Sequence, residues 1–149
     1  MKGRRSARRL ALETLYESDI RDEPGTTAWL RRLEAGDPLS DPDLDEETTR
    51  AAVAYAGGLV RLVEERGPEI DRLISAHAER WTLERMPVLD RSLARLAVAE
   101  LLAGEVPVAV VVNEAVELAK ELSTADSPRF INGLLGRIAQ ITSGTAGAD

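Results

Sequence analysis

The 149-residue chain contains no cysteine, a single histidine, and only two tryptophans, two tyrosines and one phenylalanine. Without cysteine it cannot form disulfides, thiolate zinc sites or a thiolate nucleophile. The lone His77 supports neither a histidine-rich metal site nor the usual serine or cysteine triad. We therefore expect no catalytic residue, no metal and no cofactor. We also expect an aliphatic core, as is typical of small all-helical proteins.

Two further absences concern membranes and nucleotides. No apolar run approaches the ~18 residues of a membrane span, and no apolar block follows the charged amino end as in a secretory signal. Neither a glycine-rich phosphate-binding loop nor an HExxH motif occurs. These absences predict a cytoplasmic protein that is not an enzyme.

The charge of the chain is unevenly distributed. The formal net charge is −7, yet basic residues crowd the amino end: Lys2, Arg4, Arg5, Arg8 and Arg9. A short cationic segment on an acidic protein indicates a docking surface for a polyanion. Arginine outnumbers lysine 17 to 2, and guanidinium groups suit phosphate better than ammonium does, although codon bias produces the same ratio. The alternative is an ordinary solvated face.

The same segment continues as an amphipathic helix. Its small and apolar residues recur at helical spacing and form one stripe: Ala7, Leu10, Ala11, Thr14, Leu15 and Ser18. At about 100° per residue, Arg5, Arg8 and Arg9 point away from that stripe. We expect the stripe to pack on the body of the protein and the three guanidinium groups to reach solvent.

Apolar spacing, together with proline and glycine, predicts seven helices and no strand, and therefore an all-α fold. The predicted helices cover residues 4–20, 26–35, 45–66, 69–79, 87–103, 107–122 and 128–141. An acidic loop, residues 36–45, separates the second and third helices and is predicted to be a solvated linker. The chain divides near this loop or at Gly67-Pro68, and residues 143–149 are predicted to form a flexible tail.

The long third helix contains Gly57-Gly58 in its middle. Each glycine lowers helix stability by about 1 kcal/mol relative to alanine. Tolerating two of them indicates either the close approach of a neighbouring helix or a kink.

Arg129 and Phe130 stand at the start of the last helix, where the N–H groups of the first turn favour anions. An exposed aromatic ring beside an arginine is a stacking site for an unpaired base. The helical spacing also places Phe130 in line with Leu134 and Ile138, as a core residue would be. The spacing leaves both interpretations of Phe130 open.

Four blocks stand out along nearly the whole chain: ARRLALETLY (7–16), WTLERMPVLDRSLARLA (81–97), VPVAVVVNEAVELAK (106–120) and DSPRFINGLL (126–135). In this order they resemble the NusB family of transcription antitermination factors. The last three blocks together are highly specific, whereas the first alone is weak.

The resemblance implies a single domain, residues 1–143, made of two small helical bundles, residues 1–66 and 68–142. It also implies a non-enzymatic antitermination factor that pairs with NusE, a small-subunit ribosomal protein. The pair would bind the boxA element of nascent RNA in ribosomal RNA operons, within the antitermination complex of RNA polymerase. Some members of the family form homodimers, so a homodimer is an alternative assembly.

The same resemblance also implies roles for individual residues. The residues on or beside the RNA would be Arg4, Arg5, Arg8, Arg9, Tyr16, Asp126, Arg129 and Phe130. The helix carrying Asp90 and Arg91 would form part of the NusE surface. Because the net charge of −7 repels RNA, binding by the chain alone should be modest and steeply salt-dependent, and a basic partner should strengthen it.

Three other functions compete with this one. The first is a stand-alone relative of the RNA-binding domain that is fused to ribosomal RNA cytosine methyltransferases, which would need a downstream catalytic domain. The second is a helical protein-interaction module whose arginines are merely solvated. The third is a helix-turn-helix DNA-binding protein, which would need a short turn beside a basic base-reading face, and the sequence shows none.

Overall fold

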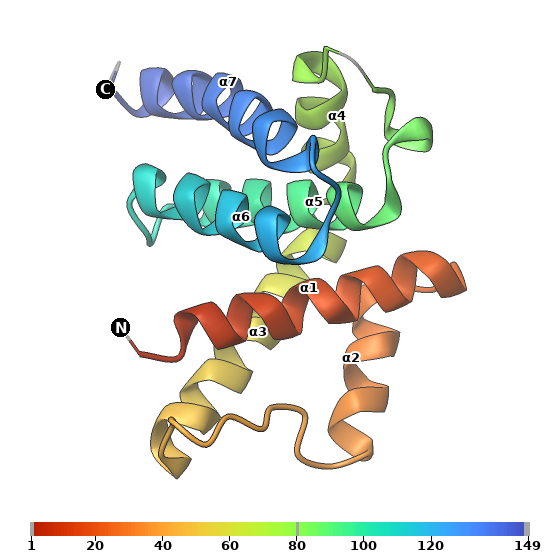
Figure 1. Ribbon diagram of the computed structural model, residues 1–149, viewed down its shortest axis with the longest axis vertical. Coiled ribbons are helices and arrows are strands. Elements are labelled where there is room, and N and C mark those ends of the chain that lie inside the picture. Colours follow the sequence, from red (N-terminus) through yellow and green to blue (C-terminus); the bar gives the residue numbers. More distant parts are fainter. Residues whose placement is uncertain (1, 80, 148–149) are drawn as a thin grey trace. The chain divides into compact units, whose positions relative to one another are not determined.

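The computed structural model describes the backbone of residues 2–79 and 81–147 and the side chains of residues 2–79 and 81–142. Over these residues the chain forms seven α-helices and one short 3-10 helix, with no strand, so the predicted all-α fold is confirmed (Figure 1). The elements are α1 (Arg4–Arg21), α2 (Gly25–Glu34), α3 (Glu46–Glu65), α4 (Gly67–His77), η1 (Leu83–Arg85), α5 (Val88–Ala103), α6 (Val108–Leu122) and α7 (Ser127–Gly147). No helix in this part of the chain is long and apolar enough to cross a bilayer.

The helices form two compact units, divided between Glu65 and Arg66. Unit 1 holds α1 to α3, and unit 2 holds α4, η1 and α5 to α7. The division immediately precedes Gly67-Pro68. Pro68 lies in the first turn of α4, where its missing N–H removes no helical hydrogen bond.

In unit 1, α1, α2 and α3 pack against one another (Figure 1). All three helices come close together at Gly25, the first residue of α2. A Cβ atom on Gly25 would lie 3.2 Å from Val60 Cγ1 of α3 and 3.4 Å from Leu15 Cδ2 of α1. The start of α2 therefore fits closely between the other two helices, and a side chain at Gly25 would require Val60 to shift slightly.

The close approach predicted for the two glycines of α3 is confirmed at Gly57. A Cβ atom there would lie 2.9 Å from three atoms of the Trp29 indole, whereas Gly58 faces open space. Trp29 belongs to α2 and is 7% exposed. Gly57 thus lets the largest side chain of unit 1 rest directly on the backbone of α3.

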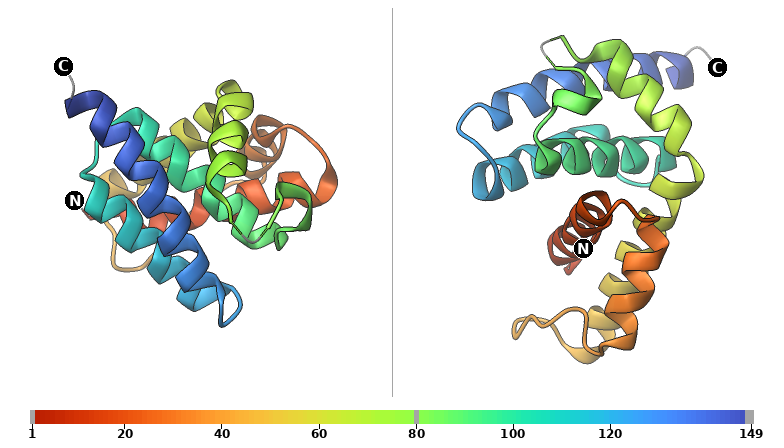
Figure 2. Two further views of the ribbon diagram at one scale, coloured as in Figure 1. Left: turned by 90° about the horizontal axis from the view of Figure 1, so that it is seen from above. Right: turned by 90° about the vertical axis from the view of Figure 1, so that its right-hand side faces the viewer.

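In unit 2, α5 is the central helix and packs against α4, α6 and α7 (Figure 2). Its side chains are buried from Ser92 to Leu101 apart from Arg95, whose Nε lies 2.9 Å from Asp71 Oδ1 of α4. The helix ends where the sequence predicts, at Gly104. This residue has φ +69°, a left-handed conformation that glycine adopts without strain.

The last helix is longer than the spacing predicts. Its backbone is helical through residues 143–147, where the sequence predicts a flexible tail. Once the preceding turns have formed, each further residue adds a helical hydrogen bond without a new nucleation step, so the helix continues although glycine and threonine are poor helix formers. Residues 148 and 149 of the predicted tail lie outside the described part of the chain.

Candidate nucleic-acid interface

The basic segment at the amino end forms the first turns of α1, which starts after Gly3 (φ +89°). Arg5 and Arg9 are exposed, as the helical spacing predicts. Arg4 is half-buried, because its guanidinium carbon lies 3.9 Å from the centroid of the Tyr55 ring in α3. This cation–π contact holds Arg4 against its own unit.

Arg8 corrects the sequence prediction that its guanidinium group reaches solvent. Its exposed fraction is 5%, and it has an interaction partner. The reason is that the buried surface of α1 is wider than one stripe. Leu12, one turn after Arg8 on the same side of the helix, is fully buried although it lies outside the predicted stripe.

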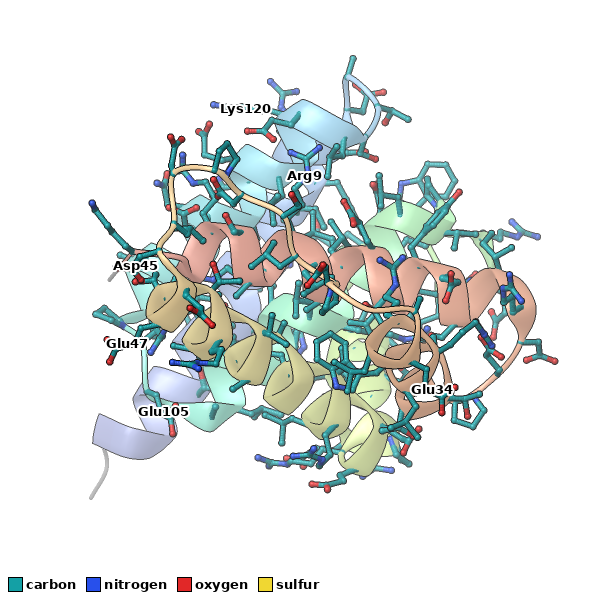
Figure 3. The ribbon with its side chains drawn as sticks, turned by 90° about the horizontal axis from the view of Figure 1, so that it is seen from below. Arg9, Glu34, Asp45, Glu47, Glu105 and Lys120 are labelled. Carbon is teal, nitrogen blue, oxygen red and sulfur yellow. The ribbon has the colours of Figure 1, made fainter. Side chains whose placement is uncertain are left out.

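Carboxylates of the acidic loop lie near the start of α1. Ser6 Oγ donates a 2.7 Å hydrogen bond to Asp41 Oδ2. At the other end of the loop, the backbone N–H of Thr48 donates to Asp45 Oδ1 at 2.7 Å. This bond, with a smaller contribution from the charge of Lys2, lowers the pKa of Asp45. Figure 3 shows the loop crossing unit 1 from Glu34 at the end of α2 to Asp45 beside α1. The loop is thus not only a solvated linker.

The second candidate surface is a groove of about 350 Å³ in unit 2, at the start of α7. Its lining residues are Glu79, Trp81, Asp126, Arg129, Phe130, Gly133 and Arg137. Three of them, Asp126, Arg129 and Phe130, are residues that the sequence assigns to RNA. Asp126 and Arg129 are exposed, and Phe130 is half-buried. Both interpretations of Phe130, a core residue and an exposed ring, therefore apply in part, since the ring is partly packed and also faces the groove.

Arg137 forms one wall of this groove. Its Nε donates a 2.9 Å hydrogen bond to the carbonyl oxygen of His77, and its Nη1 lies 3.8 Å from Glu79 Oε1. A Cβ atom on Gly133, one turn earlier in α7, would lie 3.2 Å from Arg137 Nη1. Gly133 therefore leaves space for a guanidinium group that holds the end of α4 to α7.

Sequence reasoning did not identify Glu79, Trp81 or Arg137 as part of this surface. Trp81 is 43% exposed, although tryptophan is usually well buried. The charged residues near Trp81 in the sequence are the one local feature that could have indicated an exposed ring. Nothing local places it beside α7, because that contact depends on how the α4–α5 connection is folded.

Asp90 requires a correction. The resemblance implies that it contributes to a partner surface, but its side chain is 3% exposed. Its carboxylate accepts hydrogen bonds from the hydroxyl groups of Ser123 and Ser127, the latter at 2.7 Å. Asp90 thus joins the start of α5 to the α6–α7 connection, and the two hydroxyls provide the donors that a buried carboxylate requires.

Arg91, the other residue of the implied partner surface, is half-buried. Its Nη1 donates a 2.8 Å hydrogen bond to the carbonyl oxygen of Leu83 in η1. This bond links α5 to the connection that carries Trp81.

The described residues contain no cluster that could bind a metal ion. No group of three or more carboxylates and histidines could hold a metal there. His77 Nδ1 lies 2.8 Å from the carbonyl oxygen of Leu73 in its own helix. The lone histidine is therefore engaged in local structure.

The comparisons with known proteins agree with this architecture. The model of the NusB family matches residues 5–140. The transcription antitermination protein NusB of Salinispora tropica is 46% identical over 144 residues, covering 94% of this chain and 97% of that protein. The NusB of Symbiobacterium thermophilum is 45% identical, covering 98% of this chain and 95% of that protein.

Solved structures give the same assignment. T. maritima NusB is 34% identical with a TM-score of 0.74, covering 92% of this chain and 90% of that one. A crystal structure of the antitermination factors NusB and NusE in complex with double-stranded RNA contains a chain that is 27% identical with a TM-score of 0.78, covering 95% of this chain and 98% of that one. The chain therefore belongs to the NusB family of transcription antitermination proteins, which are not enzymes.

Proposed function

We propose that this protein binds boxA RNA in ribosomal RNA operons, pairs with NusE, and so helps RNA polymerase read through terminators in the cytoplasm. The observation that carries the proposal is the groove of unit 2, where two aromatic rings and two arginines line one hollow. Unpaired bases stack on aromatic side chains, and guanidinium groups bind the phosphates between them. The related complex of NusB and NusE with double-stranded RNA supports RNA binding and NusE pairing by this fold.

The basic turns of α1 provide the second element of the proposal. Arg5 and Arg9 are exposed, and Arg4 and Arg8 are held against the protein. Two exposed guanidinium groups release few counterions when they bind phosphate, so the RNA affinity of the chain alone should be modest. A partner that brings further basic groups would raise the affinity of the pair well above that of either protein.

The first test removes the exposed cations of α1. We expect the Arg5→Ala, Arg9→Ala double variant to weaken binding of single-stranded boxA RNA. The salt slope of log Kd should fall by about 1.4, because each lost phosphate contact in a single strand contributes about 0.7. The measurement is a fluorescence-anisotropy titration at several salt concentrations, with and without NusE.

The control for this test is a double variant that removes the same charge elsewhere. Arg61→Ala with Arg72→Ala takes two exposed arginines from α3 and α4. It should change the salt slope much less. Equal slopes for the two double variants would remove α1 from the RNA-binding surface.

The second test concerns the groove. Trp81→Ala should weaken RNA binding by about 1–3 kcal/mol, the value of one stacked base, while Trp81→Phe should keep most of the affinity. Thermal denaturation should show a small loss of stability, because the ring is 43% exposed. Leu30→Ala is the matched control, since Leu30 is 57% exposed and belongs to unit 1.

Intrinsic fluorescence reports on the same ring independently. Trp29 of α2 is buried against α3, so added RNA should not reach it. Quenching of tryptophan fluorescence by RNA should therefore come from Trp81 and should disappear in Trp81→Phe. Full RNA affinity in Trp81→Ala, together with unchanged quenching in Trp81→Phe, would exclude the groove as a base-binding surface.

A further inference from the structure

Arg9, one of the two exposed arginines of the α1 RNA-binding segment, lies beside a carboxylate of the same helix. Arg9 Nε is 3.5 Å from Glu13 Oε1, one turn later, and both side chains are 49% exposed. Figure 3 shows Arg9 along α1, on the side of unit 1 that the acidic loop crosses. An exposed pair of this kind adds little to stability, so it exchanges easily for another partner.

The second oxygen of Glu13 faces another cation. Glu13 Oε2 lies 3.7 Å from Arg32 Nη1, which belongs to α2. Glu13 is therefore placed between two guanidinium groups, one in the proposed RNA-binding segment and one outside it. If Arg9 turned to another anion, Glu13 would keep Arg32 as its counter-ion.

The row of charges continues from Arg32 through Glu17 and Arg31 to Glu23. Arg32 Nη2 lies 3.9 Å from Glu17, and Arg31 Nη1 lies 2.9 Å from the other oxygen of Glu17. Arg31 Nη2 then contacts both oxygens of Glu23, at 2.8 and 2.6 Å. This hydrogen bonding lowers the pKa of Glu23 and shows that this end of the row is firmly paired.

The Glu23 contacts are thus short, whereas Glu13 lies 3.5 Å from Arg9 and 3.7 Å from Arg32. We propose that Glu13 competes with an RNA phosphate for Arg9, and that Arg32 retains Glu13 when the phosphate takes its place. The inference rests on the proposed RNA binding by α1. It assigns Glu13 a role in setting affinity, although Glu13 itself does not touch RNA.

Physically, the arrangement lowers the affinity for any polyanion and limits the cost of releasing Arg9. Without Arg32, the displaced Glu13 carboxylate would face the incoming phosphate with no counter-ion, and like charges repel. Because both competitors are anions, the effect of Glu13 should be largest at low salt and should fade as ions screen the pair.

The experiment measures the Kd for single-stranded boxA RNA in the presence of NusE. Glu13→Gln keeps the shape of the side chain and should tighten binding about two- to fivefold more than Glu34→Gln. Glu34, an exposed residue at the end of α2, provides the same change in net charge (Figure 3). Equal effects of the two substitutions would overturn the inference.

A charge-neutral variant gives an independent test. Glu13→Asp keeps the net charge of −7 but withdraws the carboxylate from Arg9 by one methylene, so it should also tighten binding, by about twofold. Weaker or unchanged binding with an unchanged circular dichroism spectrum would count against competition by Glu13.

The role of Arg32 is tested by a double-mutant cycle. Arg32→Gln should weaken RNA binding about twofold more than Arg61→Gln, and this extra loss should vanish in the Glu13→Gln background. An equal loss in both backgrounds would overturn the role of Arg32.

Arg9→Ala separates this inference from the function on which it rests. If Arg9→Ala weakens binding while Glu13→Gln behaves like Glu34→Gln, only the competition fails. If Arg9→Ala leaves the Kd unchanged, the placement of RNA on α1 fails as well.

Discussion

Replacing Asp90 by lysine is expected to lower the free energy of unfolding by about 3–5 kcal/mol, because it puts an ammonium group where a buried carboxylate is hydrogen-bonded. Asp90 is 3% exposed and accepts from Ser123 and Ser127. The substitution would leave both hydroxyls without their acceptor and would bury a new charge. In a chain of this size the melting temperature should fall by about 6–20 °C.

Two further variants show which part of this effect comes from Asp90 itself. Glu84→Lys makes the same change of charge at an exposed position in η1 and should stay within about 0.5 kcal/mol of the parent. Asp90→Asn keeps the shape and one acceptor oxygen, so its loss should be intermediate. A melting temperature for Asp90→Lys equal to that of Glu84→Lys would show that the carboxylate does not hold the α6–α7 connection.

This expectation also changes how a loss of partner binding should be interpreted. Ser127 is the first residue of α7, which carries Arg129 and Phe130 into the groove. A variant at Asp90 would therefore disturb the proposed RNA surface as well as any NusE contact of α5. Partner affinity is better tested at Arg91, which is only half-buried.

The second large effect is expected at the adjacent glycines of α3. Gly57→Ala should destabilise the protein by about 1–3 kcal/mol, because a Cβ atom 2.9 Å from the Trp29 indole overpacks a buried contact. Gly58→Ala meets open space and should stabilise the helix by up to about 1 kcal/mol. Urea denaturation of the two variants measures the difference directly.

A second background tests whether the Trp29 indole causes the opposite effects of the two substitutions on stability. In a Trp29→Phe background, the smaller ring leaves more space above Gly57, so Gly57→Ala should be less destabilising than in the parent. Gly58→Ala should have the same effect in both backgrounds. A stabilising Gly57→Ala in the parent would mean that Trp29 does not rest on the backbone of α3.

Most of the fold could be predicted from local pattern because the ends of its helices are clearly marked in the sequence. Proline and glycine mark the ends at Gly67-Pro68, Pro87, Gly104 and Pro107, and apolar spacing marks the lengths between them. The extension of α7 past Ile141 was not predicted. Its composition is that of a tail, whereas helix propagation depends on the packed turns that precede it.

The candidate sites were less predictable. Asp126, Arg129 and Phe130 share one short block of the sequence and line the same groove, while their role in RNA binding stays a prediction. Trp81 joins the groove from the connection between α4 and α5, and nothing near it in the chain indicates that neighbour. At Arg8 the prediction was wrong, because helical spacing placed its side chain in solvent whereas the structure buries it.

By itself, the order of residues determined the helical class, most helix ends and the family, because hydrogen bonding within a helix and its apolar period depend on neighbours three or four positions apart. Tertiary structure alone decided that Trp29 requires Gly57, that Asp90 binds two serine hydroxyls, and that Trp81 faces α7. Those outcomes depend on which surfaces meet after the helices form. Close packing and the pairing of buried polar groups act between residues that are distant in the chain.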